Sequence, residues 1–447
     1  MIRFQRSGSC SRFVSLAAAV TLAFLGTASA ASKIEPIVSP GGIKAWLVRE
    51  QAVPMVAIDY AFLGGANADP AGKPGVANMV VALLDEGAGD LDARAFQERM
   101  EEKAIQLGFV AGRDHFRGSL RSLTANLDSA VELLRLALTS PRFDPEPVEL
   151  VRNQVLANLS RATTNPNDIV NRRWWAAAFP GHPYGQPSNG TPESVAAITP
   201  DDLKTYVRNV FARDTLTIGI VGDIEPKAAG ELLDRAFGGL PAKATLAPVP
   251  NATMQGLGER VVVNLDVPQT VISFGSPGIG RHDPDFFTAY VVNHILGGGS
   301  HTSRLYREVR EKRGLAYGIR SNLIWMEHAN ILSGSTATQS ARAAETLAII
   351  DQETRELAAD GPTQDELDKA KAFLKGSYAL AFDTSGKIAG QILQIQLDNL
   401  GIDYPERRNA LIDAVTLADA KRVAKRLLDT KALTVVVGRA QGLPKTN

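Results

Sequence analysis

Residues 53–58 read VPMVAI and residues 267–272 read VPQTVI, so one short apolar pattern recurs 214 positions further along the chain. The same offset carries Asp69-Pro70 onto Asp283-Pro284, and each Asp-Pro pair leads into an apolar segment. Apolar runs of this kind are typical of buried strands and helices. The spacing indicates that the second part of the chain repeats the first.

The ends of the two copies match as well. TPDDLK at 199–204 resembles TLADAK at 416–421, and LTIGIVG at 216–222 resembles LTVVVG at 433–438, now with an offset of 217. Four matches in the same order and at nearly one spacing are difficult to obtain by chance. We therefore predict two copies of one domain.

A segment rich in proline and small residues, LPAKATLAPVPNATMQGLG, separates the two copies. It shows little periodicity, which is typical of a linker. We predict an N-terminal domain at 31–240, a linker at 241–258 and a C-terminal domain at 259–447.

Each copy shows the same order of predicted elements. An alternating strand is followed by a buried helix, an amphipathic helix, a strand or hairpin, two long helices, a last helix and an apolar strand. This order favours a sheet with helices on one side. The predicted fold class is α+β, with two homologous domains that each contain a mainly antiparallel sheet. The predicted helices lie at 74–84, 92–106, 126–138, 144–160 and 200–211 in the first copy, and at 284–296, 303–313, 340–358, 363–382 and 417–428 in the second.

Residues 1–30 have the pattern of a secretory signal peptide. Three arginines precede the apolar run FVSLAAAVTLAFLG, and ASA at 28–30 is a small-residue cleavage site. An uncleaved membrane anchor is the alternative, which the shortness of the apolar run disfavours. The single cysteine precedes that run, so the mature chain is predicted to contain no thiol or disulfide. An exported chain without cysteine favours a periplasmic location.

Charge and hydropathy argue against two classes of partner. The chain has 48 Lys and Arg against 48 Asp and Glu, so no net charge attracts polyanions over a distance. No apolar run of about 18 residues follows the signal segment. We therefore predict no nucleic-acid binding, and no membrane association after signal cleavage.

Three stretches resemble the pitrilysin-like zinc peptidases, the family that includes insulin-degrading enzyme and mitochondrial processing peptidase. They are GKPGVA before the first apolar helix, FPGHPYGQPSNGTPESVAAITPDDLKTYVRNVFARDTLTIGIVGDI at the end of the first copy, and ILGGGSHTSRLYREVREKRGLAYGI in the second. The resemblance covers nearly all of the mature chain. It implies that the two domains form half of a clamshell.

Active members of that family carry H-x-x-E-H on the first apolar helix and a further Glu on a later helix. Histidines four residues apart share a helix face and can bind one zinc ion, while the Glu between them acts on the metal-bound water. Here Asn78, Val81 and Ala82 occupy the positions of His, Glu and His, and Asn158 lies near that of the distal Glu. We therefore predict no metal site and no cleavage by this chain alone. A distorted zinc site is the alternative.

The second copy keeps the family's other signature, REKRGLAY at 310–317. The resemblance implies that Arg310 and Tyr317 point at the catalytic cleft. A guanidinium and a phenol can donate to the scissile carbonyl there and stabilise the developing oxyanion. The alternative treats Arg310 as one of several solvated charges and Tyr317 as a packed aromatic.

Three consecutive glycines, Gly297, Gly298 and Gly299, precede this signature. Glycine lets a backbone approach a ligand closely. In mitochondrial processing peptidase a Gly-rich loop of the non-catalytic subunit helps to handle substrate. The resemblance therefore implies substrate binding here, and a simple turn between two helices is the alternative.

Some bacterial members of the family work as pairs of half-size subunits, one with the zinc motif and the other with the Arg/Tyr pair. The resemblance implies that this chain is the zinc-less subunit of a periplasmic heterodimeric metallopeptidase that degrades unfolded peptides. A homologous partner would carry H-x-x-E-H and the zinc, so this chain needs no cofactor of its own. The alternatives are a pseudopeptidase with a purely structural role and a stand-alone peptide-binding protein.

Overall fold

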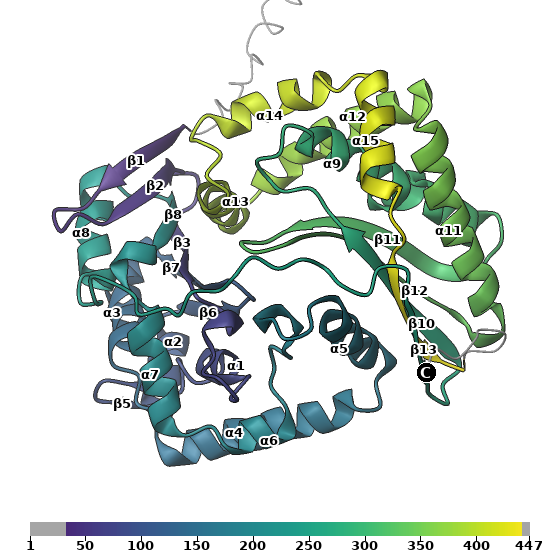
Figure 1. The fold of residues 1–447 in the computed structure, drawn as a ribbon. Helices are drawn as coiled ribbons and strands as arrows, with labels where there is room; N and C mark the ends of the chain where they lie inside the picture. The colour runs from purple at the N-terminus through teal and green to yellow at the C-terminus, as the bar shows by residue number, and fades with distance from the viewer. Residues whose placement is uncertain (1–32, 440–447) are drawn as a thin grey trace, which may run out of the picture. The chain divides into compact units, whose positions relative to one another are not determined.

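Two mixed β-sheets organise residues 33–439, the part of the chain that the computed structural model describes (Figure 1). The chain divides into two units, Met1–Lys33 and Ile34–Asn447, and both sheets belong to the second unit. The predicted signal peptide lies outside the described residues.

The first sheet has six strands. β2 and β8 run parallel, and all other neighbours in this sheet pair antiparallel. In spatial order the strands are β1 (Ile34–Val38), β2 (Lys44–Arg49), β8 (Thr217–Gly222), β3 (Met55–Leu63), β7 (His115–Leu123) and β6 (Gln106–Ala111). A separate two-stranded pair consists of β4 (Gly87–Ala88) and β5 (Leu91–Asp92).

The second sheet repeats this arrangement with five strands. In spatial order they are β9 (Arg260–Asn264), β13 (Leu433–Gly438), β10 (Gln269–Pro277), β12 (Asn330–Gln339) and β11 (Ala316–Trp325). They take the places of β2, β8, β3, β7 and β6, and β9 pairs parallel with β13 as β2 does with β8. The predicted two-copy α+β fold is therefore confirmed.

The helices of the two halves follow the same order. In the first half they are α1 (Val76–Val81), α2 (Ala93–Glu102), α3 (Leu127–Thr139), α4 (Pro145–Ala162), α5 (Pro166–Ala178), α6 (Pro192–Ala196), α7 (Pro200–Val210) and α8 (Pro226–Phe237). In the second half they are α9 (Phe286–Asn293), α10 (Arg304–Tyr306), α11 (Ala343–Asp360), α12 (Gln364–Gly376), α13 (Ser385–Leu397), α14 (Tyr404–Asp413) and α15 (Leu417–Leu428). Each helix predicted from the sequence has a counterpart here. The structure adds α5, α6, α8, α13 and α14.

Helix capping explains one of the sequence matches between the copies. α7 and α15 each begin after a threonine, and the Thr199 and Thr416 hydroxyls accept hydrogen bonds from the backbone N–H of Asp202 and Asp419. A threonine at this position satisfies an N–H group that has no partner inside the helix. The shared Thr and Asp therefore mark the same helix start in both halves.

Each sheet also receives one helix from the other half. α5, from the first half, packs on β10 and β13 of the second sheet, whereas α13, from the second half, packs on β3 and β8 of the first. Trp174 of α5 joins Val271 and Val435 in one apolar cluster, and Ile392 of α13 joins Ala57 in another. The other face of each sheet faces the core of its own half. The sequence predicted helices on one side of each sheet. The structure adds, on the opposite side, one helix that comes from the other half of the chain.

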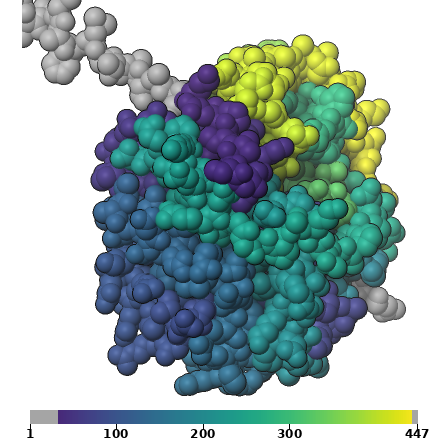
Figure 2. All heavy atoms as spheres, turned by 90° about the vertical axis from the view of Figure 1, so that its left-hand side faces the viewer, coloured from purple at the N-terminus to yellow at the C-terminus, as the bar shows by residue number. Residues whose placement is uncertain are grey.

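The connection between the halves, residues 238–259, contains no helix or strand. It follows α8 and leads into β9, at the position predicted for the linker. Further contact between the halves comes from the hairpin of β1 and β2, whose Ile34 and Trp46 pack near Ile388 of α13. Figure 2 shows this purple hairpin beside yellow residues of the second half.

Within residues 33–439, no helix has the length and apolar character needed to cross a membrane.

Candidate functional site

Helix α1 holds the positions that correspond to the zinc motif. Asn78 and Val81 lie inside this helix, and Ala82 follows its last residue. Val81 packs against the core of the first half. Asn158 lies on the neighbouring helix α4, is exposed, and accepts a hydrogen bond from Arg161 of the same helix. Val81 therefore serves core packing, and the Asn158 amide makes a local hydrogen bond.

A metal ion needs several convergent donor atoms. Within residues 33–439, the structure places no three His, Cys, Asp or Glu side chains together in a way that could hold one.

Arg310 and Tyr317 lie together, as the sequence signature predicts. The Arg310 guanidinium carbon lies 4.6 Å from the centroid of the Tyr317 ring and 5.0 Å from that of Tyr306. Arg310 Nη1 also donates a hydrogen bond to the Tyr306 hydroxyl. Tyr317 is 86% exposed, although large aromatic side chains are usually buried. The guanidinium thus contacts two tyrosine rings, and one of them, Tyr317, carries the exposed phenol. The three side chains form one compact polar group.

Irregular backbone carries both residues. Arg310 lies in a π-helical turn, Arg307–Glu311, in which Lys312 N donates to Arg307 O at 2.9 Å. Tyr317 lies in a β-bulge of β11, because the pairing with β12 shifts between Ala316 and Ile319. π-turns and bulges interrupt regular hydrogen bonding and occur often at functional sites. Two such irregularities within about ten residues single out this junction as a candidate site.

The neighbouring basic side chains form ion pairs with glutamates. Arg307, Lys312 and Arg313 pair with the buried carboxylate of Glu308, at 3.4, 2.6 and 2.6 Å. Arg304 forms a two-pronged pair with Glu366, at 2.7 Å for each contact. Arg310 therefore differs from the basic residues around it, because it contacts two tyrosine rings whereas they pair with glutamates.

Burial of the Glu308 carboxylate would by itself raise its pKa. The hydrogen bonds from Lys312 and Arg313 outweigh this effect and lower that pKa to about 2. Glu308 therefore stays ionised near neutral pH and stabilises the turn that carries Arg310. Its role depends on tertiary contacts, so the sequence did not single it out. Tyr306 was missed as well, although its position four residues before Arg310 on a helix was a usable signal.

The three glycines are packed into a turn. Gly297 and Gly298 belong to a π-helical turn, His294–Gly298, which continues α9. A Cβ atom at Gly297 would lie only 2.6 Å from Ser321 Oγ of β11, and one at Gly299 would lie 2.8 Å from His294 Nε2. Close packing therefore requires glycine at both positions. Substrate binding by Gly297, Gly298 and Gly299 stays a prediction.

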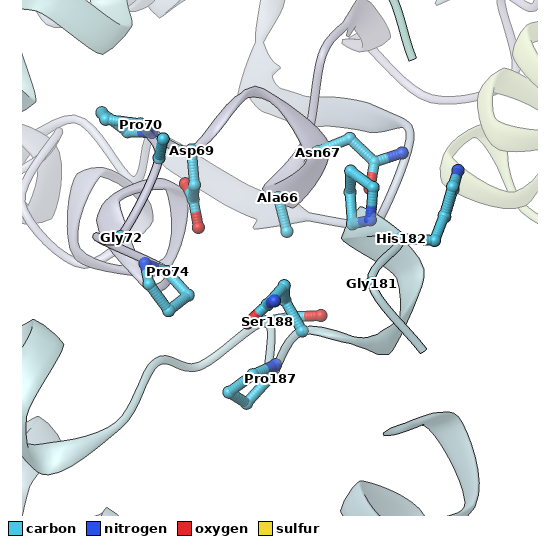
Figure 3. A pocket seen from close by; sticks show the side chains of 13 residues that line it. Ala66, Asn67, Asp69, Pro70, Gly72, Pro74, Gly181, His182, Pro187 and Ser188 are labelled. Atoms are coloured by element: carbon cyan, nitrogen blue, oxygen red, sulfur yellow. The ribbon is translucent and has the colours of Figure 1, made fainter. Parts of the chain in front are cut away.

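A cavity of about 310 Å³ opens beside the start of α1, next to the loop at 181–188. Figure 3 shows Asp69 and His182 on different sides of this cavity. His182 Nδ1 accepts a hydrogen bond from Tyr184 N at 3.0 Å, and its Nε2 lies 2.9 Å from Pro250 O. His182 therefore holds two loop segments together.

Asp69 gives rise to a pH-dependent prediction. Its carboxylate accepts hydrogen bonds from Gly75 N and Ala77 N, at 2.7 Å each. Burial nevertheless raises its pKa to about 7, and these two bonds lower it only in part. The folded state therefore holds this proton at pH values where the unfolded chain has lost it. Stability contributed by the protonated form is present below about pH 4 and is lost as the pH rises to about 7.

We expect Asp69→Asn to gain stability relative to the wild type as the pH rises from about 4 to about 7, by up to about 4 kcal/mol. Asparagine cannot ionise, so it avoids the cost of a buried charge. Urea unfolding of both proteins across this pH range measures the difference. A difference that does not vary with pH would contradict the prediction.

Comparisons with known proteins agree with these observations. Residues 47–192 match the family model described as "Insulinase (Peptidase family M16)", and residues 197–374 match the one described as "Peptidase M16 inactive domain". A Helicobacter pylori protein named "Non-peptidase homolog YmxG" is 29% identical over 333 residues, which cover 74% of this chain and 77% of that protein. A Bacillus subtilis protein named "Uncharacterized zinc protease YmxG" is 24% identical over 348 residues, which cover 77% and 83%.

Solved structures give the same result. The crystal structure of a peptidase M16 inactive domain from Pseudomonas fluorescens has a TM-score of 0.86 and 28% identity, and the match covers 93% of this chain and 100% of that one. A protease from Helicobacter pylori, with a TM-score of 0.81 and 21% identity over 91% of this chain and 99% of that one, shares the fold. The resemblance inferred from the sequence is confirmed. The chain belongs to the insulinase, or M16, peptidase family, and it lacks the H-x-x-E-H motif of the active members.

Proposed function

We propose that this chain is the zinc-less subunit of a heterodimeric M16 metallopeptidase. In this proposal a homologous partner supplies the two histidines, the glutamate and the zinc ion. This chain supplies Arg310, Tyr317 and one wall of the space that encloses an unfolded peptide. The signal-like N-terminus supports assembly of the pair in the periplasm.

The observation that carries the proposal is the contact between Arg310 and the exposed Tyr317 ring at 4.6 Å. An exposed tyrosine gains little stability from its position, and two backbone irregularities of a kind that is frequent at functional sites display the pair. A chain with a purely structural role has no need of such a pair. Donors held in place before a reaction begins can stabilise the oxyanion that forms when a peptide carbonyl is attacked.

The partner-dependent activity can be tested with two purified proteins. Residues 31–447 of this chain and its H-x-x-E-H homologue from the same genome are assayed separately and mixed, with a fluorogenic unfolded peptide. We expect cleavage in the mixture, with stoichiometric zinc in the partner, no zinc in this chain, and loss of activity with a chelator. A zinc-bearing preparation of this chain that cleaves alone would refute the proposal.

Two other results would point to the alternatives. Equal cleavage by the partner with and without this chain would support a purely structural role. Capture of the peptide by this chain alone, with no effect on cleavage in the mixture, would support a peptide-binding protein.

A further inference from the structure

The bulge in β11 decides on which face of the sheet Tyr317 lies. From Ile319 onward, Ile319, Ser321 and Leu323 are buried and the residues between them are exposed or nearly so. Side chains alternate along a regular strand, so this pattern would direct position 317 into the core. Tyr317 and Gly318 instead oppose a single residue of β12, Ala337, and Tyr317 becomes exposed. One inserted residue therefore moves the phenol from the core side to the surface.

Two threonines of β12 hold the backbone on either side of Tyr317. Thr338 Oγ1 donates to Leu315 O at 2.7 Å, and Thr336 Oγ1 donates to Gly318 O at 2.8 Å. Both side chains are buried, at 1% and 5% exposure. Leu315 immediately precedes β11, and Gly318 is the second of the two residues in the bulge. Their carbonyl groups are therefore fixed by hydroxyl groups of the neighbouring strand.

The surroundings keep the first of these hydroxyls in place. Thr338 Oγ1 lies 3.1 Å from Thr346 Oγ1 of α11, and Thr346 is fully buried. The Thr346 hydroxyl also lies 3.0 Å from Arg342 O, which holds it on α11 beside Thr338. Hydrogen bonds made by threonine hydroxyls thus link β12 to the backbone around Tyr317 and to the covering helix α11.

We propose that Thr336 and Thr338 are positioning residues that fix the β11 bulge and thereby hold the Tyr317 phenol beside Arg310. Neither threonine contacts a reacting group. Each acts through the backbone on one side of Tyr317. The catalytic consequence rests on the proposed function above, whereas the positioning of Tyr317 does not.

The structural part is tested without any partner protein. The tyrosines are replaced by 3-fluorotyrosine, and the ¹⁹F resonance of Tyr317 is assigned by its loss in Tyr317→Phe. We expect Thr336→Val and Thr338→Val to shift or broaden that resonance, because valine keeps the shape of threonine but removes the hydroxyl. Thr338→Ser keeps the hydroxyl and is expected to restore the wild-type signal.

Thr270 provides a matched control. It is a fully buried threonine of β10 that lies opposite Thr338 in the sheet, but its hydroxyl donates to Ser340 Oγ at 3.0 Å and not to the backbone of the bulge. Thr270→Val should leave the Tyr317 resonance unchanged, even if it lowers the unfolding temperature. An unchanged resonance in both folded variants, Thr336→Val and Thr338→Val, would overturn the proposal. An equal change in Thr270→Val would also overturn it.

Kinetics with the zinc-bearing partner give a second readout. We expect Thr338→Val to lower kcat about tenfold, the factor that corresponds to one hydrogen bond. KM should change little, because the substrate does not contact the threonine, and Thr338→Ser should restore kcat. If the wild-type pair cleaves nothing, the proposed function fails while the ¹⁹F result still decides the positioning role. A loss of kcat that appears without a change in the Tyr317 resonance counts against it.

Discussion

Arg310→Ala is expected to lower the proposed partner-dependent cleavage by about 10²–10³-fold, the usual cost of removing one oxyanion donor. The guanidinium lies between the Tyr306 and Tyr317 rings, so alanine removes both a charge and the group that orients the phenol. The loss should appear in kcat, because the oxyanion exists only after the carbonyl is attacked. Steady-state cleavage of a fluorogenic peptide by the mixed subunits measures it.

Two further variants sharpen this test. Tyr317→Phe removes only the phenol hydroxyl and should also lower kcat, while the ring stays beside Arg310. Arg307→Ala is the matched control, because Arg307 lies on the same turn but pairs with Glu308 at 3.4 Å, a partly exposed pair of small energetic value. Full activity of Arg310→Ala, or equal losses in Arg307→Ala and Arg310→Ala, would refute the assigned role.

Trp174→Ala is expected to destabilise the protein by about 3–5 kcal/mol, the usual cost of truncating a large buried side chain. Trp174 is 2% exposed, and its Nε1 donates to Leu433 O of β13 at 3.3 Å. A Cβ atom at Gly275 would lie 2.5 Å from the Trp174 ring, so the strand leaves room for that ring. The variant creates a cavity between a helix of the first half and the sheet of the second.

Because the helices α5 and α13 are exchanged, the wild type should unfold in one cooperative transition. We expect Trp174→Ala to shift that whole transition, and urea unfolding followed by circular dichroism measures the shift. Arg173→Ala, at an exposed position of the same helix, should change the stability by less than about 0.5 kcal/mol. Two separate transitions in the wild type, or a cost below about 1 kcal/mol, would show that the halves are not coupled through Trp174.

Much of the site could be read from residue types. Asn78, Val81 and Ala82 are poor metal ligands wherever they lie, because the chemistry of each side chain is fixed by its identity. The signature around Arg310 and Tyr317 indicated that the two residues meet. It could not show that Arg307, Lys312 and Arg313 turn to Glu308 while Arg310 turns to two rings. That choice depends on a buried carboxylate whose surroundings come from several elements.

By itself the sequence determined that the chain contains two copies of one α+β unit and that the zinc motif is missing from the first. Both properties are local, since they follow from periodicity, capping residues and the identity of single side chains. Only the tertiary structure decided that each sheet takes a helix from the other half and that Tyr317 faces outward. Helix exchange depends on contacts between residues more than 150 positions apart, such as Trp174 and Leu433. The outward tyrosine depends on one inserted residue, which a strand pattern read by alternation does not reveal.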